Sequence, residues 1–500
     1  MSLTTTSTPE GVELAEAATV APATDGLVVR LGTALASERI RYCQWTGHAK
    51  LARWLVGEGD IDLLVDRRDA DRFARTLERL GFKLALPPGS QLPAGVVSYL
   101  GLDPAIGRLV HVHTQFRLIV GSDWATHYHL PLERTLLETT IQRTVFRTPP
   151  PELELLLLVI RRTLRHHPRD GFRRGEPPWL AALQPGLHRL EREIERRALT
   201  HALANHLPEV SPALFDRCLA TLRPGCPAPN RLAARIALAW RLRGYARRPS
   251  AGTMAKRLLL ALAARAGLQA EWKRGPGKRL AAGGAVIGLV GADGAGKSTC
   301  ARALDDWLAA ELLARRVHLG RPPRSLATLL SGGALKGSHW LDRLLGRTSP
   351  SPVSVHLELL RTVATARDRA RLALRVRHFA LSGGVVLCDR YPVPEAYALA
   401  GPSTAQGIAA SARGRLAAWL RRVENRYYTQ IGAPDLVLAL TVDPETAVRR
   451  KVDEPAGYVR ERARLLWNTD WSPSGAIVVD AARPQADVLS ELRARIWEAI

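Results

Sequence analysis

The stretch GLVGADGAGKSTCARAL, residues 288–304, decides the fold of the C-terminal part of this 500-residue chain. Within it, Gly291 to Ser298 match the spacing GxxxxGK[ST] of a P-loop. The β-branched run AVIGLV (285–290) comes just before, and TCARALDDWLAAELLA (299–314) has the periodicity of a helix. A strand, a glycine-rich loop and a helix in this order predict a phosphate-binding site where the helix begins.

Each residue type in this loop has a chemical task. Glycines let backbone N–H groups close around the β-phosphate of a nucleotide, and the helix N-terminus adds a favourable dipole. Lys297 is expected to bridge the β- and γ-phosphates, and the Ser298 hydroxyl to ligate Mg²⁺. The loop therefore predicts ATP and Mg²⁺ as cofactors. The residues expected to surround the nucleotide are Gly291, Ala292, Gly294, Ala295, Gly296, Lys297, Ser298 and Thr299.

The rest of the chain divides by composition and periodicity. Residues 1–26 have the Thr/Ala/Pro content of a disordered leader, and 27–150 alternate strand-like and helix-like patterns. Residues 151–280 are helical and end in a Gly/Lys/Arg-rich linker, and 281–500 form the P-loop domain. We therefore expect an α/β protein with a small N-terminal α/β domain, a helical middle and a C-terminal P-loop domain.

Composition excludes several classes of protein. The longest apolar runs, such as LLLLVI (155–160), are much shorter than the ~20 residues of a membrane span. The N-terminus also lacks the basic start and apolar block of a signal peptide, so we expect a cytoplasmic protein. The five cysteines have no CxxC or Cys/His spacing, which argues against a disulfide framework and against a zinc site.

The formal net charge of +24 is compatible with several partners. Nucleic acid, an anionic membrane surface and polyphosphate substrates all attract a basic protein, and a coding bias toward arginine gives the same composition. No basic run is interleaved with aromatic residues, so we predict no specific nucleic-acid binding. The Arg-rich amphipathic stretch 231–266 is open to two interpretations, packing against its own domains or peripheral contact with a membrane. A homodimer is also compatible with the sequence.

Further motifs in the C-terminal part are typical of a kinase. GGVVLCDRYP (383–392) places Asp389 at the end of a second buried strand, where a carboxylate can hold Mg²⁺ or orient an acceptor oxygen, with Arg390 beside it for a phosphate. PDLVLALTVDPETAVRRK (434–451) supplies another strand of a parallel sheet and then a helix, and GAIVVDAARP (475–484) supplies a last strand and loop. The Arg/Lys-rich segment 449–462 suits a mobile lid.

Together, GADGAGKST, DRY and PDLVLALTVDPETAVRRK resemble the thymidylate kinase family over roughly residues 285–500. The resemblance implies a doubly wound parallel sheet and transfer of the γ-phosphoryl group of ATP to a nucleoside monophosphate such as dTMP. It also implies that Asp293 lies near the acceptor phosphate, that Asp389 and Arg390 form the family's DR pair, and that the loop containing Ala481 lies against adenine. Arg369 and Tyr397 match positions of the acceptor site. The P-loop contains no arginine, so charge in the transition state is expected from Arg449, Arg450, Lys451 or Arg460.

Two departures from the family pattern leave the acceptor open. VHLGRPPRS (317–325) lacks the glutamate of an REPG-type turn, and PVPEAYALAG (392–401) lacks both the serine and the base-recognising glutamine that usually follow DRY. The acceptor can therefore also be a sugar or a modified nucleotide. A further alternative is a nucleotide-sensing module that controls the front domain.

The front domain carries a second candidate site. Asp60 and Asp62 alternate on the predicted strand DIDLLV (60–65), so both side chains point to one face, as two-metal nucleotidyl transfer requires. With Gly47-His48 upstream, this resembles the nucleotidyltransferase superfamily over roughly residues 38–115. The pattern is incomplete, because His48 replaces a serine and HVH (111–113) stands where a third carboxylate is expected. Catalysis by this domain and a binding or scaffold role both stay open.

Overall fold

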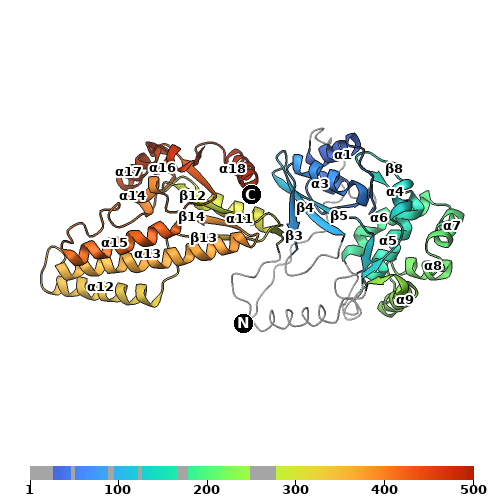
Figure 1. Cartoon of the computed structure of the whole chain (residues 1–500), viewed down its shortest axis with the longest axis horizontal. Helices are drawn as coiled ribbons and strands as arrows, with labels where there is room; N and C mark the ends of the chain where they lie inside the picture. Colours follow the sequence, from blue (N-terminus) through green and yellow to red (C-terminus); the bar gives the residue numbers. More distant parts are fainter. Residues whose placement is uncertain (1–25, 47–50, 88–94, 122–126, 167–177, 248–276) are drawn as a thin grey trace. The chain divides into compact units, whose positions relative to one another are not determined.

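The computed structural model describes residues 26–46, 51–87, 95–121, 127–166, 178–247 and 277–500. The chain separates into two compact units (Figure 1). Unit 1 comprises residues 1–84 and 91–269, and unit 2 comprises 85–90 and 270–500. Several predictions fall outside the described residues: the leader up to residue 25, the Gly47-His48 turn, and the parts of the amphipathic stretch and the linker within 248–276.

Unit 2 is built on a parallel sheet with strand order β13-β14-β12-β15-β16. This confirms the parallel α/β sheet expected from the sequence. The central strands are rich in Val, Leu and Ile and almost fully buried, as strands covered by helices on both faces must be. The strands are β12 (Val286–Gly291), β13 (Ala314–His318), β14 (Val385–Asp389), β15 (Leu436–Thr441) and β16 (Ile477–Asp480).

The strand order of unit 2 determines where a ligand can bind. The chain runs from β12 to β13 and β14 on one side, and later to β15 and β16 on the other. Loops leaving the carboxyl ends of β12 and its neighbours therefore diverge and open a crevice, which is the usual ligand site of such sheets. The P-loop leaves β12 at this edge.

The helices of unit 2 complete its layers. Helix α13 contacts both α12 and α15, and the three helices run side by side (Figure 1). The longer helices are α11 (Lys297–Ala309), α12 (Leu326–Leu344), α13 (Pro352–Leu381), α15 (Arg415–Ile431), α17 (Ala456–Trp467) and α18 (Gln485–Ala499). Two short ones, α14 (Tyr397–Ala400) and α16 (Pro444–Arg450), lie in the connections after β14 and β15.

Unit 1 contains a mixed sheet in which four strands run in the order β1-β2-β5-β4. These strands are β1 (Tyr42–Gln44), β2 (Asp60–Val65), β4 (Val96–Asp103) and β5 (Arg108–Gln115). Ile61 and Leu63 of β2 pack into a core with helices α1 (Leu27–Ser37) and α3 (Ala70–Arg79). Leu64 belongs to a second core, on the opposite face of the sheet.

This second core also contains the helical middle of the chain. Cys43 of β1 and Val120 of β6 (Ile119–Gly121) share it with side chains of helix α5 (Pro151–Leu164) and the helices that follow. These are α6 (Pro178–Glu193), α7 (Arg196–His206), α8 (Pro212–Ala220) and α9 (Ala228–Arg241). Helix α5 thus covers the sheet face on which Leu64 lies. Within the described ranges, every helix is too short or too polar to cross a bilayer.

A buried carboxylate in unit 2 generates a stability prediction. Glu424 of α15 accepts hydrogen bonds from the backbone N–H of Ser403, at 3.0 Å, and from its hydroxyl, and both residues are buried. Glu424→Ala leaves two buried donors unsatisfied, so we expect a loss of about 1–3 kcal/mol in unfolding free energy, with a smaller loss for Glu424→Gln. Urea denaturation measures both variants, and an unchanged midpoint for Glu424→Ala would contradict this assignment.

Candidate functional site

The loop between β12 and α11 has the backbone geometry of a phosphate cradle. Gly294 has a φ of +86°, and a Cβ there would lie 2.5 Å from the carbonyl oxygen of Ala447. Gly296, with a φ of +76°, precedes the first residue of α11, and no side chain caps this helix within the described structure. The first N–H groups of α11 are therefore available to an anion.

Lys297 is the first residue of α11, and its side chain turns back to the loop that precedes the helix. Its side chain is only 6% exposed, and Nζ donates a hydrogen bond of 2.5 Å to the carbonyl oxygen of Ala292. Burial lowers the pKa of Lys297 to about 8, although the neighbouring Asp293 carboxylate opposes this shift. Because water solvates this ammonium group poorly, a phosphate beside it would strongly stabilise its charged form.

Asp293, in the P-loop, lies between two arginines from distant parts of unit 2. Arg390 Nη2 donates a hydrogen bond of 2.6 Å to Asp293 Oδ1, and Arg462 Nε forms an ion pair of 3.1 Å with Oδ2. The carboxylate is about 10% exposed, so little solvent screens these interactions. Asp293 thus connects the P-loop to the end of β14 and to helix α17.

Arg390 follows β14 in a strained backbone conformation. Its φ is +55°, a region that residues other than glycine rarely adopt. The backbone N–H of Arg390 donates to the carbonyl of Leu289, and its side chain is held by Asp293. A Cβ added to Gly320 would lie 3.1 Å from the Arg390 Cβ, which shows how closely the two backbones approach. This conformation turns the guanidinium toward the P-loop.

Asp389 and Ser298 provide the oxygen donors that Mg²⁺ prefers. Asp389 is the last residue of β14, and its Oδ1 is buried without a hydrogen-bond partner among the described residues. Ser298 is exposed at the start of α11. An orphaned carboxylate oxygen at the ligand edge of the sheet, beside a glycine cradle, fits a metal ion carried in with nucleotide phosphates.

The basic segment, residues 449–462, spans the end of α16 and the first half of α17. Arg449 donates to Thr446, Lys451 pairs with Asp453, and Arg460 pairs with Glu445 at 2.7 and 3.0 Å. Arg450 Nη1 donates a 2.7 Å hydrogen bond to the carbonyl of Ala481, so it braces the loop predicted to lie against adenine. Of the cations in this segment, the structure brings Arg462 against the P-loop carboxylate.

The acceptor-site predictions converge on one aromatic cluster. Arg369 of α13 is buried and donates to the carbonyls of Leu319, at 2.9 Å, and Gly320, at 3.3 Å, and to the Tyr428 hydroxyl. Tyr428 packs edge-to-face on Tyr397, with ring centroids 5.7 Å apart. Arg369 and Tyr397 therefore meet through Tyr428, and Arg369 holds the loop after β13.

Three residues of this site were missed by the sequence analysis. Arg462 lies within the segment assigned to a lid, but its charge alone did not distinguish it from its neighbours. His318, at the end of β13, is paired with Asp389 in the sheet, and burial lowers its pKa. Tyr428 carries no motif at all. Sequence spacing gives no signal for His318 or Tyr428. Strand pairing brings His318 to Asp389, and the packing of α15 brings Tyr428 to Arg369.

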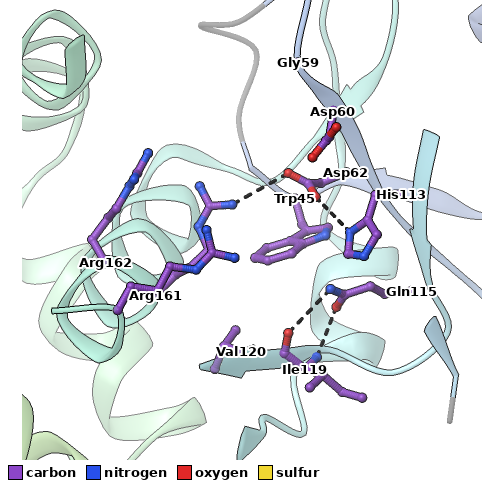
Figure 2. Close-up of a pocket in the computed structure, with 11 residues that line it drawn as sticks. Trp45, Gly59, Asp60, Asp62, His113, Gln115, Ile119, Val120, Arg161 and Arg162 are labelled. Carbon is purple, nitrogen blue, oxygen red and sulfur yellow. Dashed lines mark hydrogen bonds and ion pairs between the residues drawn. The ribbon is translucent and has the colours of Figure 1, made fainter. Parts of the chain in front are cut away.

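In unit 1, Asp60 and Asp62 lie on the sheet face covered by α5 (Figure 2). Asp60 contacts His111 and Asp62 contacts His113, the two histidines of the neighbouring strand β5. No three His, Cys, Asp or Glu side chains in the described parts of the chain come together as a metal site. Nucleotidyl transfer by this unit stays a prediction.

Comparisons with known proteins concern less than half of the chain. No protein-family model matches it. A thymidylate kinase of Jannaschia sp. is 32% identical over 174 residues, which is 35% of this chain and 72% of that protein. A thymidylate kinase of Cutibacterium acnes is 31% identical over 224 residues, 43% of this chain and 97% of that protein. The Escherichia coli protein named uncharacterized ATP-binding protein YghR is 26% identical over 215 residues, 41% and 84% of the two chains.

The pKa of Lys297 predicts a pH dependence of nucleotide binding. Below pH 8 the ammonium is protonated and attracts phosphate, whereas above its pKa of about 8 the group becomes neutral. We expect ATP affinity to fall about tenfold between pH 7 and pH 9, following loss of the charged form. Calorimetric titration across this range measures it, with Lys297→Ala as the variant that should show weak, pH-independent binding. A flat profile in the unmodified protein would refute the expectation.

Proposed function

The chain belongs to the thymidylate kinase family, and we propose that unit 2 transfers the γ-phosphoryl group of Mg²⁺-ATP to a nucleoside monophosphate, with dTMP as the first candidate. The matched lengths of 174 to 228 residues fit within unit 2, which contains the P-loop. Membership of this family supports a nucleotide-binding, kinase-like function. The identity of the acceptor is what we propose here.

One observation carries the proposal: the arrangement of charge around Asp293. A P-loop carboxylate that holds Arg390 and Arg462 beside Lys297 collects three cations at the point where phosphates would meet. A mere nucleotide-binding loop needs only the lysine and the backbone N–H groups. Additional cations aimed at the same point are what charge development on a transferring phosphoryl group requires.

Roles for the individual residues follow from this geometry. The P-loop N–H groups and Lys297 would hold the β- and γ-phosphates, and Arg450 would keep the loop around Ala481 in place against adenine. Ser298 and Asp389 would hold Mg²⁺, which supplies charge neutralisation on the phosphates when bound. Arg390 would position the acceptor phosphate, and Arg462 would neutralise charge in the transition state without an arginine in the P-loop itself.

A non-nucleotide acceptor is the second candidate. The observation that favours it is the tight cluster of Arg369, Tyr428 and Tyr397, in which the Tyr428 hydroxyl donates a 2.6 Å hydrogen bond to the carbonyl of Gly401. The cluster occupies polar groups that a base would otherwise engage, and residues 392–401 contain no glutamine for base recognition. A sugar phosphorylated at a hydroxyl group would need no base-recognising residue on this side of the site.

ADP release with Mg²⁺-ATP against dTMP, dUMP, the other nucleoside monophosphates and simple sugars tests both candidates. We expect stimulation by dTMP, and loss of that stimulation, by about 10²-fold or more, in Lys297→Ala. Stimulation by sugars alone would transfer the proposal to the second candidate. The absence of stimulation by any acceptor, or stimulation that is unchanged in Lys297→Ala, would overturn both.

Arg462 and Arg460 form a matched pair for the assignment of the transition-state cation. The two residues share helix α17, but Arg462 pairs with Asp293 and Arg460 with Glu445. We expect Arg462→Ala to lower kcat by about 10²-fold with a smaller effect on KM for ATP, and Arg460→Ala to stay within about threefold. Equal losses in the two variants would show that general charge on this helix matters rather than the position of Arg462.

A further inference from the structure

A second pocket lies in unit 1, between the sheet and helix α5, and has a volume of about 440 Å³ (Figure 2). Trp45, Asp60, Asp62 and His113 line it from the sheet side. Arg161 and Arg162 of α5 and Arg165, which follows the last residue of that helix, line it from the other side. Three arginines and two carboxylates therefore share the lining of one pocket. The mixture of charges distinguishes this pocket from an apolar gap between packed elements.

Both carboxylates are already engaged by neighbours on the protein. Asp60 Oδ1 is 2.5 Å from His111 Nδ1, and Asp62 Oδ1 is 3.1 Å from His113 Nδ1. Arg161 Nη1 lies 3.7 Å from Asp62 Oδ2, and Figure 2 shows its guanidinium pointing to that carboxylate. Asp62 therefore has both a histidine and an arginine as neighbours, and the Asp60 side chain, which contacts His111, is 57% exposed.

Arg161 is the unusual member of the arginine group. Its side chain is 6% exposed, yet its interactions with described residues are limited to the distant ion pair with Asp62 and stacking over Trp45, at 5.2 Å from the ring centroid. Its Nε is buried without a hydrogen-bond partner. A buried guanidinium with unused donors is costly unless another group supplies acceptors.

The three arginines also repel one another. Burial, with the charges of Arg165 and Arg162, lowers the pKa of Arg161 to about 10, and burial and Arg165 likewise lower the pKa of Arg162. Crowded cations with depressed pKa values are stabilised by an anion placed among them, which relieves the repulsion and satisfies their N–H donors.

We propose that this pocket binds a small phosphomonoester, with its phosphate against Arg161, Arg162 and Arg165 and its hydroxyl groups donating to Asp60. Planar guanidinium groups suit the oxygens of a phosphate, and an exposed carboxylate suits a hydroxyl donor. Trp45 supplies the apolar wall. Binding is direct and requires no divalent metal, since the carboxylates that could hold one face histidines and Arg161 instead.

Calorimetric titration of the full-length protein with ribose 5-phosphate in EDTA tests this site. We expect saturable binding that weakens with added salt, weaker binding of inorganic phosphate, and none of ribose. Arg165→Glu, at an exposed position, should lower the affinity by roughly tenfold or more, and Arg162→Gln should lower it less. A thermal melt of each variant verifies that it is folded.

Two controls locate the binding. Arg217→Glu reverses an exposed charge on α8, outside the pocket, and should leave the affinity unchanged. Lys297→Ala alters the P-loop of unit 2 and should also leave it unchanged, so the result does not depend on the proposed kinase activity. The proposal is overturned by absent binding, by binding lost in Lys297→Ala but retained in the arginine variants, or by binding of nucleoside triphosphates alone and only with Mg²⁺ or Mn²⁺.

Discussion

The carboxylate of Asp293 is the constraint on which the candidate site of unit 2 depends. It stands in the P-loop, but its two partners come from the end of β14 and from helix α17. A carboxylate this poorly exposed must be paired, and removing one partner of such a pair costs more than the pair itself contributes. Asp293 therefore holds three separate segments in one arrangement, and it does so beside the buried Lys297. The strained backbone of Arg390 is tolerated because the same interaction fixes its side chain.

The two units handle charge in related ways. Each sets an arginine from a helix against a carboxylate of the sheet or of a loop that follows it, Arg462 against Asp293 in unit 2 and Arg161 against Asp62 in unit 1. In unit 2 a glycine cradle and an orphaned Asp389 oxygen accompany the arginines, which suits a nucleotide with a metal ion. In unit 1 histidines accompany the carboxylates, and the excess of guanidinium groups suits an anion alone. Similar residue types therefore lead to different chemistry because their neighbours differ.

Local pattern predicted the parts of the structure whose geometry is local. The P-loop spacing implies a strand, a turn and a helix, and the alternation of Asp60 and Asp62 implies a shared face, since both follow from backbone periodicity. The direction and the partners of long side chains could not be predicted from such local patterns. Arg450, Arg460 and Arg462 are all arginines of one basic segment, and only the packing of α17 shows which of them reaches Asp293. The contribution of α5 to the second pocket was likewise invisible, because the helical middle was treated as a region separate from the front sheet, whereas its side chains share one core with β1 and β6.

A double-mutant cycle between Asp293 and Arg462 tests the central claim most directly. The rate of phosphoryl transfer is measured in the unmodified protein, in Asp293→Asn, in Arg462→Ala and in the double variant. If Asp293 acts by positioning Arg462 as well as Arg390, each single change slows transfer, and the double variant is faster than two independent losses would make it, with a coupling of about 1–3 kcal/mol. If the two losses add within about 0.5 kcal/mol, the residues act independently and the account of the site is wrong.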